Sequence, residues 1–466
     1  MAITTTTNLS NLEFRNRIDG ELYNPRLMES FLELKRSRLE LFPLSSFCLI
    51  KSGTTPKDRD DTLKDGPILF KTTDIRNNVL SAFDSYYHIH ESIHNRMAVT
   101  KLRPYDVLLN IVGATLDVIG RSSIIMDDFQ EANITQAMVF LRIRKKEFLP
   151  GYLFAFLNTK YAQNQIKRYA RPTGQFNLNL VEVGKLMAPK PSLTHQQNIE
   201  NLIVNCAAYQ KQSHILYHQA ETLLAQELQL DQLQLPNKKW YTADYYEAVK
   251  SKRLDSTHFR DAYSDLFGFL ENRFSCKRIG QIVTVNRRGL QPVYSENGTI
   301  MVVNSKHLST THILYDQTER TTEEEFSKQS VAQIKNGDVL IYTTGAYIGL
   351  TNAFNSKEKA LASNHVNILR LSDTYSSIDP NYLALVLNSK IGKLQTEKHS
   401  RGSAQLELYP ADIAKFVIPI INNNRMREIG ELVRNSLSAL NQSKQLLAQA
   451  KRRVEELIEQ EANKYK

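Results

Sequence analysis

The sequence is poor in the features that mark secreted, membrane-bound or disulfide-stabilised proteins. It has 3 cysteines among 466 residues, Cys48, Cys206 and Cys276, and their spacing matches neither a disulfide framework nor a metal site. No apolar run approaches the roughly 18 residues needed to span a bilayer. The Thr-rich stretch 1–10 lacks the basic and apolar segments of a secretory signal. We therefore expect a cytoplasmic protein with no membrane partner.

Motifs of the common catalytic centres are also missing from the sequence. Gly392-Lys393 stands alone, without the loop that binds ATP phosphates, and no glycine-rich turn of the dinucleotide or methyl-donor kind occurs. Asn24-Pro25 lacks the second proline and the aromatic residue that enzymes methylating DNA amino groups need. Neither a His-Glu-x-x-His zinc site nor a Gly-x-Ser-x-Gly nucleophile elbow is present. The sequence predicts a binding protein with neither a catalytic centre nor a cofactor of its own.

Three histidines, His88, His90 and His94, form the one cluster that could hold a metal ion. Strand-like alternation would place His88 and His90 on one face. No acidic or cysteine pattern beside them suggests a set of ligands. Exposed loop histidines are therefore the favoured interpretation, and no metal site is predicted.

Basic residues exceed acidic ones, with 59 Lys and Arg against 49 Asp and Glu and a net charge of +10. This excess favours a polyanionic partner such as nucleic acid. Hydrophobic residues make up 41% and charged residues 23% of the chain, which is typical of a folded protein. A chain of this length is expected to form roughly two to four domains.

A long helical stretch occurs twice, and the rest of the chain is organised around it. In the first copy, residues 195–230, apolar or small side chains recur at intervals of three and four, as in a coiled-coil seam: Ile199, Leu202, Cys206, Tyr209, Ser213, Leu216, Ala220 and Leu223. Adding 230 gives the second copy, residues 425–461: Ile429, Leu432, Ser436, Ala439, Ser443, Leu446, Ala450 and Arg453. Arg453 breaks the pattern, so we expect the second helix to leave the pair near its end.

The segments before each long helix are repeated at nearly the same offset. Predicted strands at 68–71, 106–112 and 134–144 and a helix at 152–169 have counterparts at 300–306, 337–342, 363–370 and 382–390. The stretches 76–100 and 307–333 differ in composition, the second being acidic. This pattern indicates a duplicated domain whose two copies act on different targets.

The repeat predicts where the domains begin and end. We expect an N-terminal extension at 1–20, a first domain at 21–194, a helix at 195–230, a connector at 231–250, a second domain at 251–424 and a second helix at 425–466. Pro189 and Pro191 end the first domain just before the helix, where proline commonly lies. The connector contains Trp240, the single tryptophan of the chain.

The most specific motifs lie just before the two long helices. In each copy a Gly-polar-Gln/Asn-Leu loop leads into a strand, a proline and the helix: Gly174 to Asn177, Pro189 and His195-Gln196-Gln197, then Gly402 to Gln405, Pro419 and Arg425. Pro191 to Gln196 keeps part of a Pro-Pro-Leu-x-Glu-Gln helix entrance. The turns Gly113 to Thr115 and Gly345 to Gly349 are similar to a Gly-Thr-x-Gly turn. Together these motifs resemble the specificity (S) subunit of type I restriction–modification systems, from about Tyr23 to the C-terminus.

The resemblance implies an α+β fold with two tandem α/β target-recognition domains, each followed by a long α-helix, the two helices forming an antiparallel coiled coil. It implies a non-catalytic subunit that reads a bipartite, asymmetric site in double-stranded DNA and directs adenine methylation or ATP-dependent cleavage. Two methyltransferase (M) subunits would bring S-adenosylmethionine, and two motor-nuclease (R) subunits can join with ATP and magnesium. Alternatives are a coiled-coil scaffold protein, or a target-recognition subunit of another DNA methyltransferase system without a restriction motor.

We expect DNA contacts in the loops of both domains, because Arg and Lys suit guanine and phosphates while Gln and Asn suit adenine. The candidates are Lys51, Lys57, Arg59, Lys71, Arg121, Arg171, Gln175 and Asn177 in the first half, and Arg287, Arg288, Lys306, His307, Tyr347, Arg401, Ser403 and Gln405 in the second. Gly174 and Gly402 are expected to form turns. A helix of about 35 residues is about 50 Å long, which equals about 15 base pairs. Its exposed cations are expected to meet partner subunits or the DNA between half-sites: Arg434, Lys444, Lys451, Arg452 and Arg453.

Overall fold

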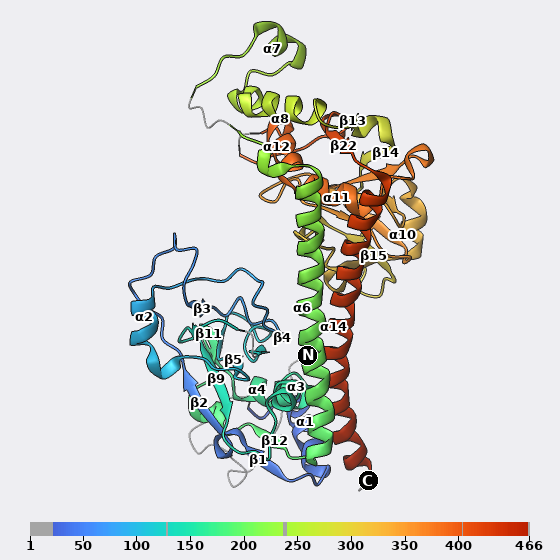
Figure 1. Cartoon of the computed structure of the whole chain (residues 1–466). Coiled ribbons are helices and arrows are strands. Elements are labelled where there is room, and N and C mark those ends of the chain that lie inside the picture. The colour runs from blue at the N-terminus through green and yellow to red at the C-terminus, as the bar shows by residue number, and fades with distance from the viewer. Residues whose placement is uncertain (1–21, 127–128, 236–239, 403, 465–466) are drawn as a thin grey trace. The chain divides into compact units, whose positions relative to one another are not determined.

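The computed structural model describes residues 22–126, 129–235, 240–402 and 404–464, which belong to two compact units (Figure 1). Unit 1 comprises Met1–Gln212 and Ala439–Lys466, and unit 2 comprises Ser213–Ser438. Each unit therefore contains a part of each long helix. The expected N-terminal extension, residues 1–20, lies outside the described residues. No helix within the described ranges is long and apolar enough to cross a membrane.

Unit 1 is built around a five-stranded sheet in the order β2-β9-β5-β7-β4. Its central strand, β5, is buried along its length and pairs antiparallel with β9 and β7. The predicted strands at 68–71, 106–112 and 134–144 correspond to β3, β5 and β9. The strands of unit 1 are β1 Leu41–Pro43, β2 Cys48–Ser52, β3 Ile68–Phe70, β4 Asn78–Val79, β5 Val107–Asn110, β6 Val112–Gly113, β7 Ser122–Ile124, β8 Ala132–Ile134, β9 Met138–Ile143, β10 Arg171–Thr173, β11 Gln175–Asn177 and β12 Met187–Pro189.

The helix predicted at 152–169 is two helices. Thr159 is the N-cap of the second one, and its side chain accepts a hydrogen bond from the backbone N–H of Ala162, which starts a new helix at this point. The short helices of unit 1 are α1 Pro25–Arg36, α2 Glu91–Arg96, α3 Pro150–Leu157, α4 Lys160–Tyr169 and α5 Leu180–Gly184.

Unit 2 repeats this arrangement with sheets β14-β21-β18-β19, β16-β15-β20-β17 and β13-β22. Its strands are β13 Ser275–Arg278, β14 Val283–Arg288, β15 Ile300–Val303, β16 Glu319–Thr321, β17 Gln333–Ile334, β18 Val339–Tyr342, β19 Thr351–Ala353, β20 Ala360–Ala362, β21 Val366–Leu371 and β22 Val417–Ile420. Its shorter helices are α7 Tyr245–Ser251, α8 Asp261–Glu271, α9 Ile279–Ile282, α10 Glu323–Lys328, α11 Pro380–Asn388, α12 Lys390–His399 and α13 Pro410–Ile413.

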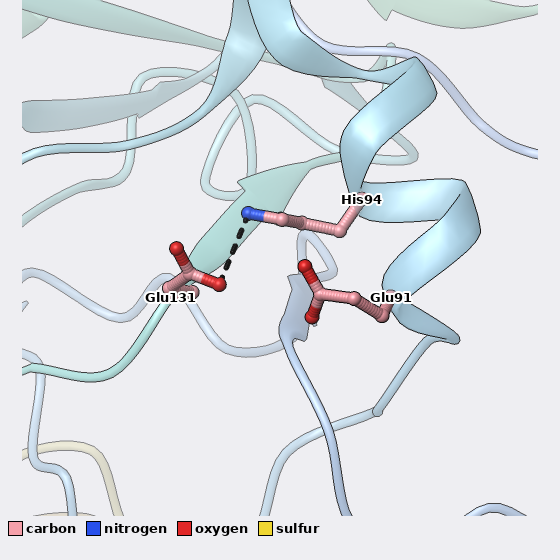
Figure 2. Close-up of side chains that lie close together, drawn as sticks. All are labelled: Glu91, His94 and Glu131. Carbon is pink, nitrogen blue, oxygen red and sulfur yellow. Dashed lines mark ion pairs between the residues drawn. The ribbon is translucent and has the colours of Figure 1, made fainter.

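The units differ most after the first strand of each parallel pair, which is β3 of the pair β3-β8 in unit 1 and β15 of the pair β15-β20 in unit 2. Unit 1 continues with β4 and α2, whereas unit 2 continues with the 3-10 helix η6 (Ser305–His307), β16 and α10. Helix α2 brings Glu91 and His94 close to Glu131, which directly precedes β8 (Figure 2). The different composition of 76–100 and 307–333 thus corresponds to different elements on a common scaffold.

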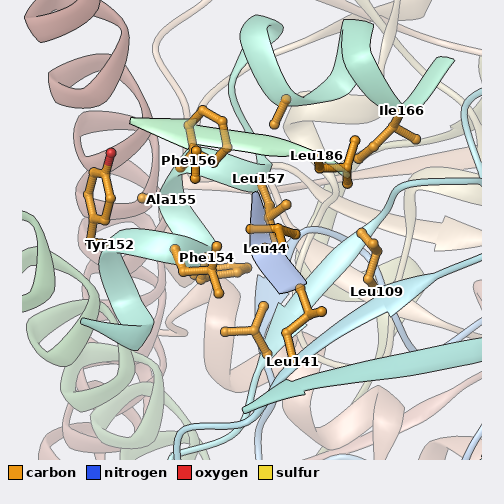
Figure 3. Close-up of a cluster of buried hydrophobic side chains, with 14 of the residues drawn as sticks. Leu44, Leu109, Leu141, Tyr152, Phe154, Ala155, Phe156, Leu157, Ile166 and Leu186 are labelled. Atoms are coloured by element: carbon orange, nitrogen blue, oxygen red, sulfur yellow. The ribbon is translucent and has the colours of Figure 1, made fainter. Parts of the chain in front are cut away.

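The main core of unit 1 lies between its large sheet and the long helices. Residues 151–157 of α3 are all buried. Figure 3 shows Phe154 and Leu157 of this helix beside Leu109 and Leu141 of the sheet. A helix that is apolar on every side needs partners on every side. Residues of both long helices complete the cluster, among them Ile199, Ile203, Ala450 and Val454.

A buried ion pair joins two neighbouring strands in each unit. In unit 1, Arg142 of β9 donates from Nε and Nη2 to the carboxylate of Asp106, at 2.7 and 2.6 Å. In unit 2, Arg370 of β21 binds Asp338 in the same bidentate manner, at 2.8 and 2.7 Å. Both aspartates are at most 1% exposed. Such a pair at the same place in both sheets confirms the internal duplication.

A buried tyrosine repeats in the same way. The Tyr152 hydroxyl donates to the carbonyl oxygen of Pro189 at 2.7 Å, and the Tyr382 hydroxyl donates to that of Pro419 at 2.8 Å. Each bond joins the first helix after the sheet to the strand that leads into a long helix. The prolines noted before the long helices therefore also accept a hydrogen bond that holds this strand in place.

The predicted long helices are α6, Leu193–Glu227, and α14, Asn423–Asn463, and they pack antiparallel within each unit (Figure 1). In unit 1, Cys206 Sγ lies 3.2 Å from Ser443 Oγ. In unit 2, Ser213 Oγ lies 3.1 Å from Ser436 Oγ. Small side chains at these positions let the helix backbones approach closely, as expected from the sequence.

The predicted seam is wrong at every second position of α6. Ile203, Tyr217 and Leu224 are buried, whereas Tyr209 is 38% exposed. The residues Leu202, Leu216 and Leu223 are only partly buried. Each of these three buried residues directly follows another apolar residue in the sequence. The apolar pattern therefore fits two alternative seams that differ by one residue, and packing selects one of them.

The expectation that α14 leaves the pair near its end is also wrong. Arg453 is exposed, but the next residue, Val454, is fully buried. Ile458 and Ala462 are buried as well. With the corrected phase, an arginine at 453 lies at the exposed edge of the helix pair and leaves the seam intact.

Candidate nucleic-acid interface

In both units a glycine turn after the central strand lies beside a polar segment from much later in the chain. In unit 1, residues 113–115 meet the hairpin 171–177, where β11 pairs Phe176 with Gly113. In unit 2, residues 344–349 meet residues 401–402 and 404–407, and the Gly345 N–H donates to the Leu406 carbonyl at 3.0 Å. We call these paired segments the hairpin surface of each unit. Two motifs recognised separately in the sequence thus form one surface.

Glycine shapes the tip of this surface. Gly402 has φ of +107°, and a Cβ there would lie 2.2 Å from the backbone oxygen of Gln405. Gly174 has φ of +76°. Residues with a side chain rarely adopt such backbone angles. Both glycines are turn formers, as the sequence indicated.

An arginine at the base of each hairpin is bound by a buried acid. Arg171 Nε donates to Glu182 at 2.8 Å, and Arg401 donates from Nε and Nη2 to Asp412 at 3.0 and 3.1 Å. Hydrogen bonding to Asp412 raises the pKa of Arg401. Burial opposes ionisation of the Asp412 carboxyl, but hydrogen bonds from Arg401 and Lys415 outweigh it and keep its pKa below the usual range. Both arginines, named as DNA contacts from the sequence, therefore also hold the hairpin to the scaffold.

Unit 2 gathers four predicted residues at its hairpin surface. Arg288 Nη2 donates to the Leu408 carbonyl at 3.1 Å, and its guanidinium lies 5.0 Å from the ring centre of Tyr409. Gln405 and Arg401 are exposed, and Tyr347 on the adjoining turn is 68% exposed. An exposed tyrosine and amide beside two guanidinium groups suit stacking and hydrogen bonding to bases.

Lys51 and Arg287 occupy the same position in their respective units. Lys51 of β2 lies opposite Phe140 of β9, and Arg287 of β14 lies opposite Ile368 of β21. Each partner precedes the ion-paired arginine of its strand by two residues. Both cations are exposed. The structure thus aligns two predicted contacts for which the sequence alone offered no pairing.

Four further candidates of unit 1 lie on the hairpin surface and on the loop between β2 and β3. Gln175 and Asn177 belong to the hairpin surface, and the Asn177 amide donates to the Gln175 carbonyl at 3.2 Å. The exposed Lys57 and Arg59 lie on the loop between β2 and β3.

Two further predicted cations of unit 1 already have partners within the chain. The Lys71 ammonium lies 3.7 Å from the ring centre of Tyr87, and Arg121 Nε donates to the Asp117 carbonyl at 2.7 Å. Neither residue belongs to the hairpin surface.

His307 was predicted to contact DNA, and its burial contradicts this. It is 1% exposed, and its Nδ1 accepts a hydrogen bond from the backbone N–H of Asn304 at 2.9 Å. At the same place in unit 1, Asp74 accepts from the backbone N–H of Lys71 at 2.7 Å. His307 therefore caps the turn after a strand, and burial lowers its pKa.

Lys306 and Ser403 of unit 2 were also predicted to contact DNA. Lys306 is hydrogen-bonded to Glu319 on β16, away from the hairpin surface. Ser403 lies outside the described residues. Of the second-half candidates, the structure therefore brings together Arg288, Tyr347, Arg401 and Gln405, while Arg287 lies on β14 next to Arg288.

Sequence reasoning missed residues that a cavity of unit 2 brings beside the hairpin. The cavity has a volume of about 910 Å³, and its lining includes Lys252, Lys393 and Arg401. The two lysines are exposed and come from segments far apart in the chain. Tyr409, which packs against Arg288, was also missed. Only the fold places these side chains together, so no sequence pattern could have indicated them.

The interpretation of the three histidines as exposed loop residues is wrong for His94. It is 1% exposed, and its Nε2 lies 3.4 Å from Glu131 Oε2. Glu91 belongs to the same group of potential ligands. No local pattern indicated this, because Glu131 lies 37 residues after His94.

One helix cation is also tied to the scaffold. Arg434 donates to Asp379 at 2.6 Å, and Asp379 in turn caps α11. Lys444, Lys451, Arg452 and Arg453 of α14 are exposed. Four of the five cations expected to meet partners are thus exposed on this helix.

Comparison with known families identifies the second half of the chain. Residues 272–452 match the family model described as the type I restriction modification DNA specificity domain. Residues 272–452 are thus similar to a type I specificity domain. The match includes the hairpin surface and ion pairs of unit 2, and it confirms the family resemblance drawn from the motifs.

Three known proteins to which the chain is similar can be named. The chain is similar to the type I restriction enzyme EcoBI specificity subunit of Escherichia coli, with 27% identity over 149 residues. This alignment covers 32% of the chain and 30% of the relative, so the chain spans less than a third of that relative's length. A type I S subunit from M. genitalium aligns over 91% of this chain and 96% of its own, with 12% identity and a TM-score of 0.45. The HsdS subunit from Thermoanaerobacter tengcongensis aligns over 91% and 96%, with 17% identity and a TM-score of 0.27.

Proposed function

We propose that both units of this chain read DNA sequence, each through its hairpin surface. The chain then acts as the specificity subunit of a type I restriction–modification complex and recognises a bipartite, asymmetric site in double-stranded DNA. It directs adenine methylation or ATP-dependent cleavage by partner chains. S-adenosylmethionine, ATP and magnesium would be bound by those partners.

The observation that supports this proposal is a common scaffold with different exposed residues. Each unit is stabilised internally by the same two contacts, one between Arg and Asp and one between Tyr and Pro. On the hairpin surfaces, however, unit 1 presents Gln175 and Asn177 where unit 2 presents Gln405, with Tyr347 on the adjoining turn. Since bases are distinguished by their hydrogen-bonding edges, different side chains on one scaffold suit different DNA sequences.

The distribution of charge fits a division between phosphate and base contacts. Lys51 and Arg287 are exposed at matching sites on the two sheets and are suited to phosphates. Arg171 and Arg401 are oriented by buried carboxylates, so little conformational entropy is lost when such a group meets a base or phosphate. The long helices supply the exposed cations Lys451, Arg452 and Arg453, which suit contacts with methyltransferase subunits or DNA.

The first step of the test is to define the site. Adenine methylation would be mapped in cells that express this chain with its methyltransferase partner, and in cells without this chain. We expect one split motif that depends on the chain. Methylation without any motif, or no dependence on the chain, would support the scaffold alternative instead.

The second step assigns the half-sites. Lys51→Ala and Arg287→Ala would be compared for binding to DNA in which one or the other half-site is scrambled. If the cations act as phosphate contacts, each variant should weaken binding contributed by one half-site and lower the salt dependence by about one charge. Gln175→Ala and Gln405→Ala should instead relax the sequence preference of one half-site, by about 1–3 kcal/mol.

Matched controls remove exposed charge elsewhere. Lys146 lies beyond the C-terminal end of β9, the end remote from Lys51, and Arg427 lies on α14. Substitution of either by alanine should leave the preference for both half-sites unchanged. Equal losses on both half-sites for Lys51→Ala and Arg287→Ala would contradict the assignment of one half-site to each unit.

A further inference from the structure

Three potential metal ligands converge beside α2 in unit 1. His94 Nε2 lies 3.4 Å from Glu131 Oε2, and ligand atoms of His94, Glu131 and Glu91 all lie within 4.8 Å of one another. Figure 2 shows the imidazole of His94 directed at Glu131, with the carboxylate of Glu91 nearby. The two glutamates are exposed and the histidine is buried. The group is therefore open to solvent on one side and fixed on the other.

The hydrogen bonds around His94 determine which ring nitrogen carries a proton. Its Nδ1 lies 2.6 Å from Asn133 Oδ1. The Asn133 amide nitrogen donates to the Met97 carbonyl and the Thr100 hydroxyl, at 3.2 and 3.3 Å, so Oδ1 is the accepting end of this side chain. Nδ1 must then donate to Asn133, and in the neutral ring Nε2 presents a lone pair.

This lone pair points at other acceptors. Nε2 is buried and has no hydrogen-bond partner within the part of the chain that the structure describes. Glu131 is a carboxylate, and Glu91, which accepts a bond from the Asn95 amide at 3.0 Å, is another. A lone pair facing carboxylate oxygens is repulsive unless a cation lies between them.

His307 in unit 2 shows the opposite arrangement at almost the same distance. Its Nε2 lies 3.3 Å from Glu319 Oε2, but its Nδ1 accepts a backbone N–H bond. The proton of the neutral ring is therefore on Nε2 and faces the carboxylate. Glu319 also accepts hydrogen bonds from Asn304 and Lys306. In unit 2 the ring thus presents an N–H to the carboxylate, although Nε2 makes no hydrogen bond there either, whereas unit 1 directs three acceptors at one point.

We propose that His94, Glu131 and Glu91 bind a divalent transition-metal ion of the Zn²⁺ type. Zinc takes histidine nitrogen and carboxylate oxygen ligands at about 2.0–2.2 Å, which places neighbouring tetrahedral ligands about 3.3–3.6 Å apart. The distance between His94 and Glu131 lies in this range. A histidine that binds zinc commonly donates its other N–H to a fixed acceptor, here Asn133. Rotation of the exposed Glu91 side chain would bring in the third ligand, and water would complete the shell.

Such an ion would join two segments of unit 1. His94 and Glu91 lie on α2, and Glu131 lies just before β8. The ion would therefore hold α2 against the parallel pair β3-β8. This role is independent of DNA recognition, and its test needs no DNA.

The test is titration of the full, untagged chain with Zn²⁺, followed by calorimetry and by the melting temperature. The wild type should bind one Zn²⁺ at this site more tightly than Zn²⁺ binds to its other histidines. Binding of Zn²⁺ should also raise its melting temperature. Glu131→Gln, an isosteric change of an exposed side chain, should weaken this binding about tenfold or more and remove the rise. His94→Gln should abolish the binding, and amide spectra would show that each variant is folded.

The matched control is His218, which is 81% exposed and lies 3.8 Å from Glu221 on α6. His218→Gln should leave the tight site unchanged. The proposal is overturned if Glu131→Gln binds Zn²⁺ as tightly as the wild type, or if the wild type has no site above its exposed histidines. Nitrogen NMR that shows a proton on His94 Nε2 unaffected by Zn²⁺ would identify a proton as the cation instead.

Discussion

In unit 1 the arginine of β9 binds Asp106, and in unit 2 the arginine of β21 binds Asp338, with nearly equal distances. Between the strands of their parallel pairs the two units diverge, since unit 1 forms α2 with a buried His94 and unit 2 forms η6, β16 and α10. This repeated contact is buried and polar, and it joins neighbouring strands of one sheet. The scaffold is thus held by interactions that tolerate little change, while its outer segments are free to differ.

The largest effect is expected from breaking the shared ion pair. Arg142→Ala and Arg370→Ala each leave a fully buried carboxylate unpaired, which should destabilise the affected unit by about 3 kcal/mol or more. Urea unfolding, with hydrogen exchange to distinguish the units, would measure the loss. Arg144→Ala, an exposed arginine next to the end of β9, should cost little. A loss in only one unit would show that the two pairs are not equivalent.

The next largest effect concerns the buried tyrosines. Tyr152→Phe and Tyr382→Phe each remove one hydroxyl and leave a proline carbonyl without its donor. Each change should cost about 1–2 kcal/mol in its own unit. The same unfolding experiment applies, and unequal losses would show where packing around the two helices differs. No change in either unit would mean that water replaces the hydroxyl.

The smallest expected effect is a difference in how the stability of unit 2 depends on acid pH. The folded-state pKa of Asp412 is below its usual value, so its ionised form stabilises unit 2 fully above the unfolded pKa of about 3.9. This contribution is lost as the pH falls through the lower folded pKa. Between about pH 5 and pH 3, wild-type unit 2 should lose more stability than Asp412→Asn. Parallel acid dependence of the two proteins would contradict the role of the Arg401–Asp412 pair.

The sequence predicted the duplication and the existence of both long helices correctly. The offset of 230 residues brought Tyr152 and Tyr382 into correspondence, and their hydroxyls make the same bond. Such predictions succeed because they depend on periodicity and on repeated order along the chain. The prediction of which face of α6 forms the seam was wrong, because Leu202 and Ile203 are equally apolar.

The candidate sites also contain residues whose roles were predictable from the sequence and residues whose roles were not. Gly174 and Gly402 were predicted as turn formers, because a backbone at positive φ favours glycine whatever surrounds it. The roles of His94 and His307 were not predictable. Whether a histidine is buried, and which nitrogen carries its proton, depends on Asn133 or the Asn304 backbone, and only folding brings the former near.

The amino-acid sequence by itself determined the repeated order of elements, the two long amphipathic helices, the motifs of a type I specificity domain and the excess of positive charge. These properties are encoded in residues that are near one another in the chain. The tertiary structure decided which face of α6 is buried, that a glycine turn and a distant hairpin form one surface, and that Glu131 meets His94. Each of these depends on contacts between segments far apart in sequence, where packing selects one arrangement among several that the local pattern permits.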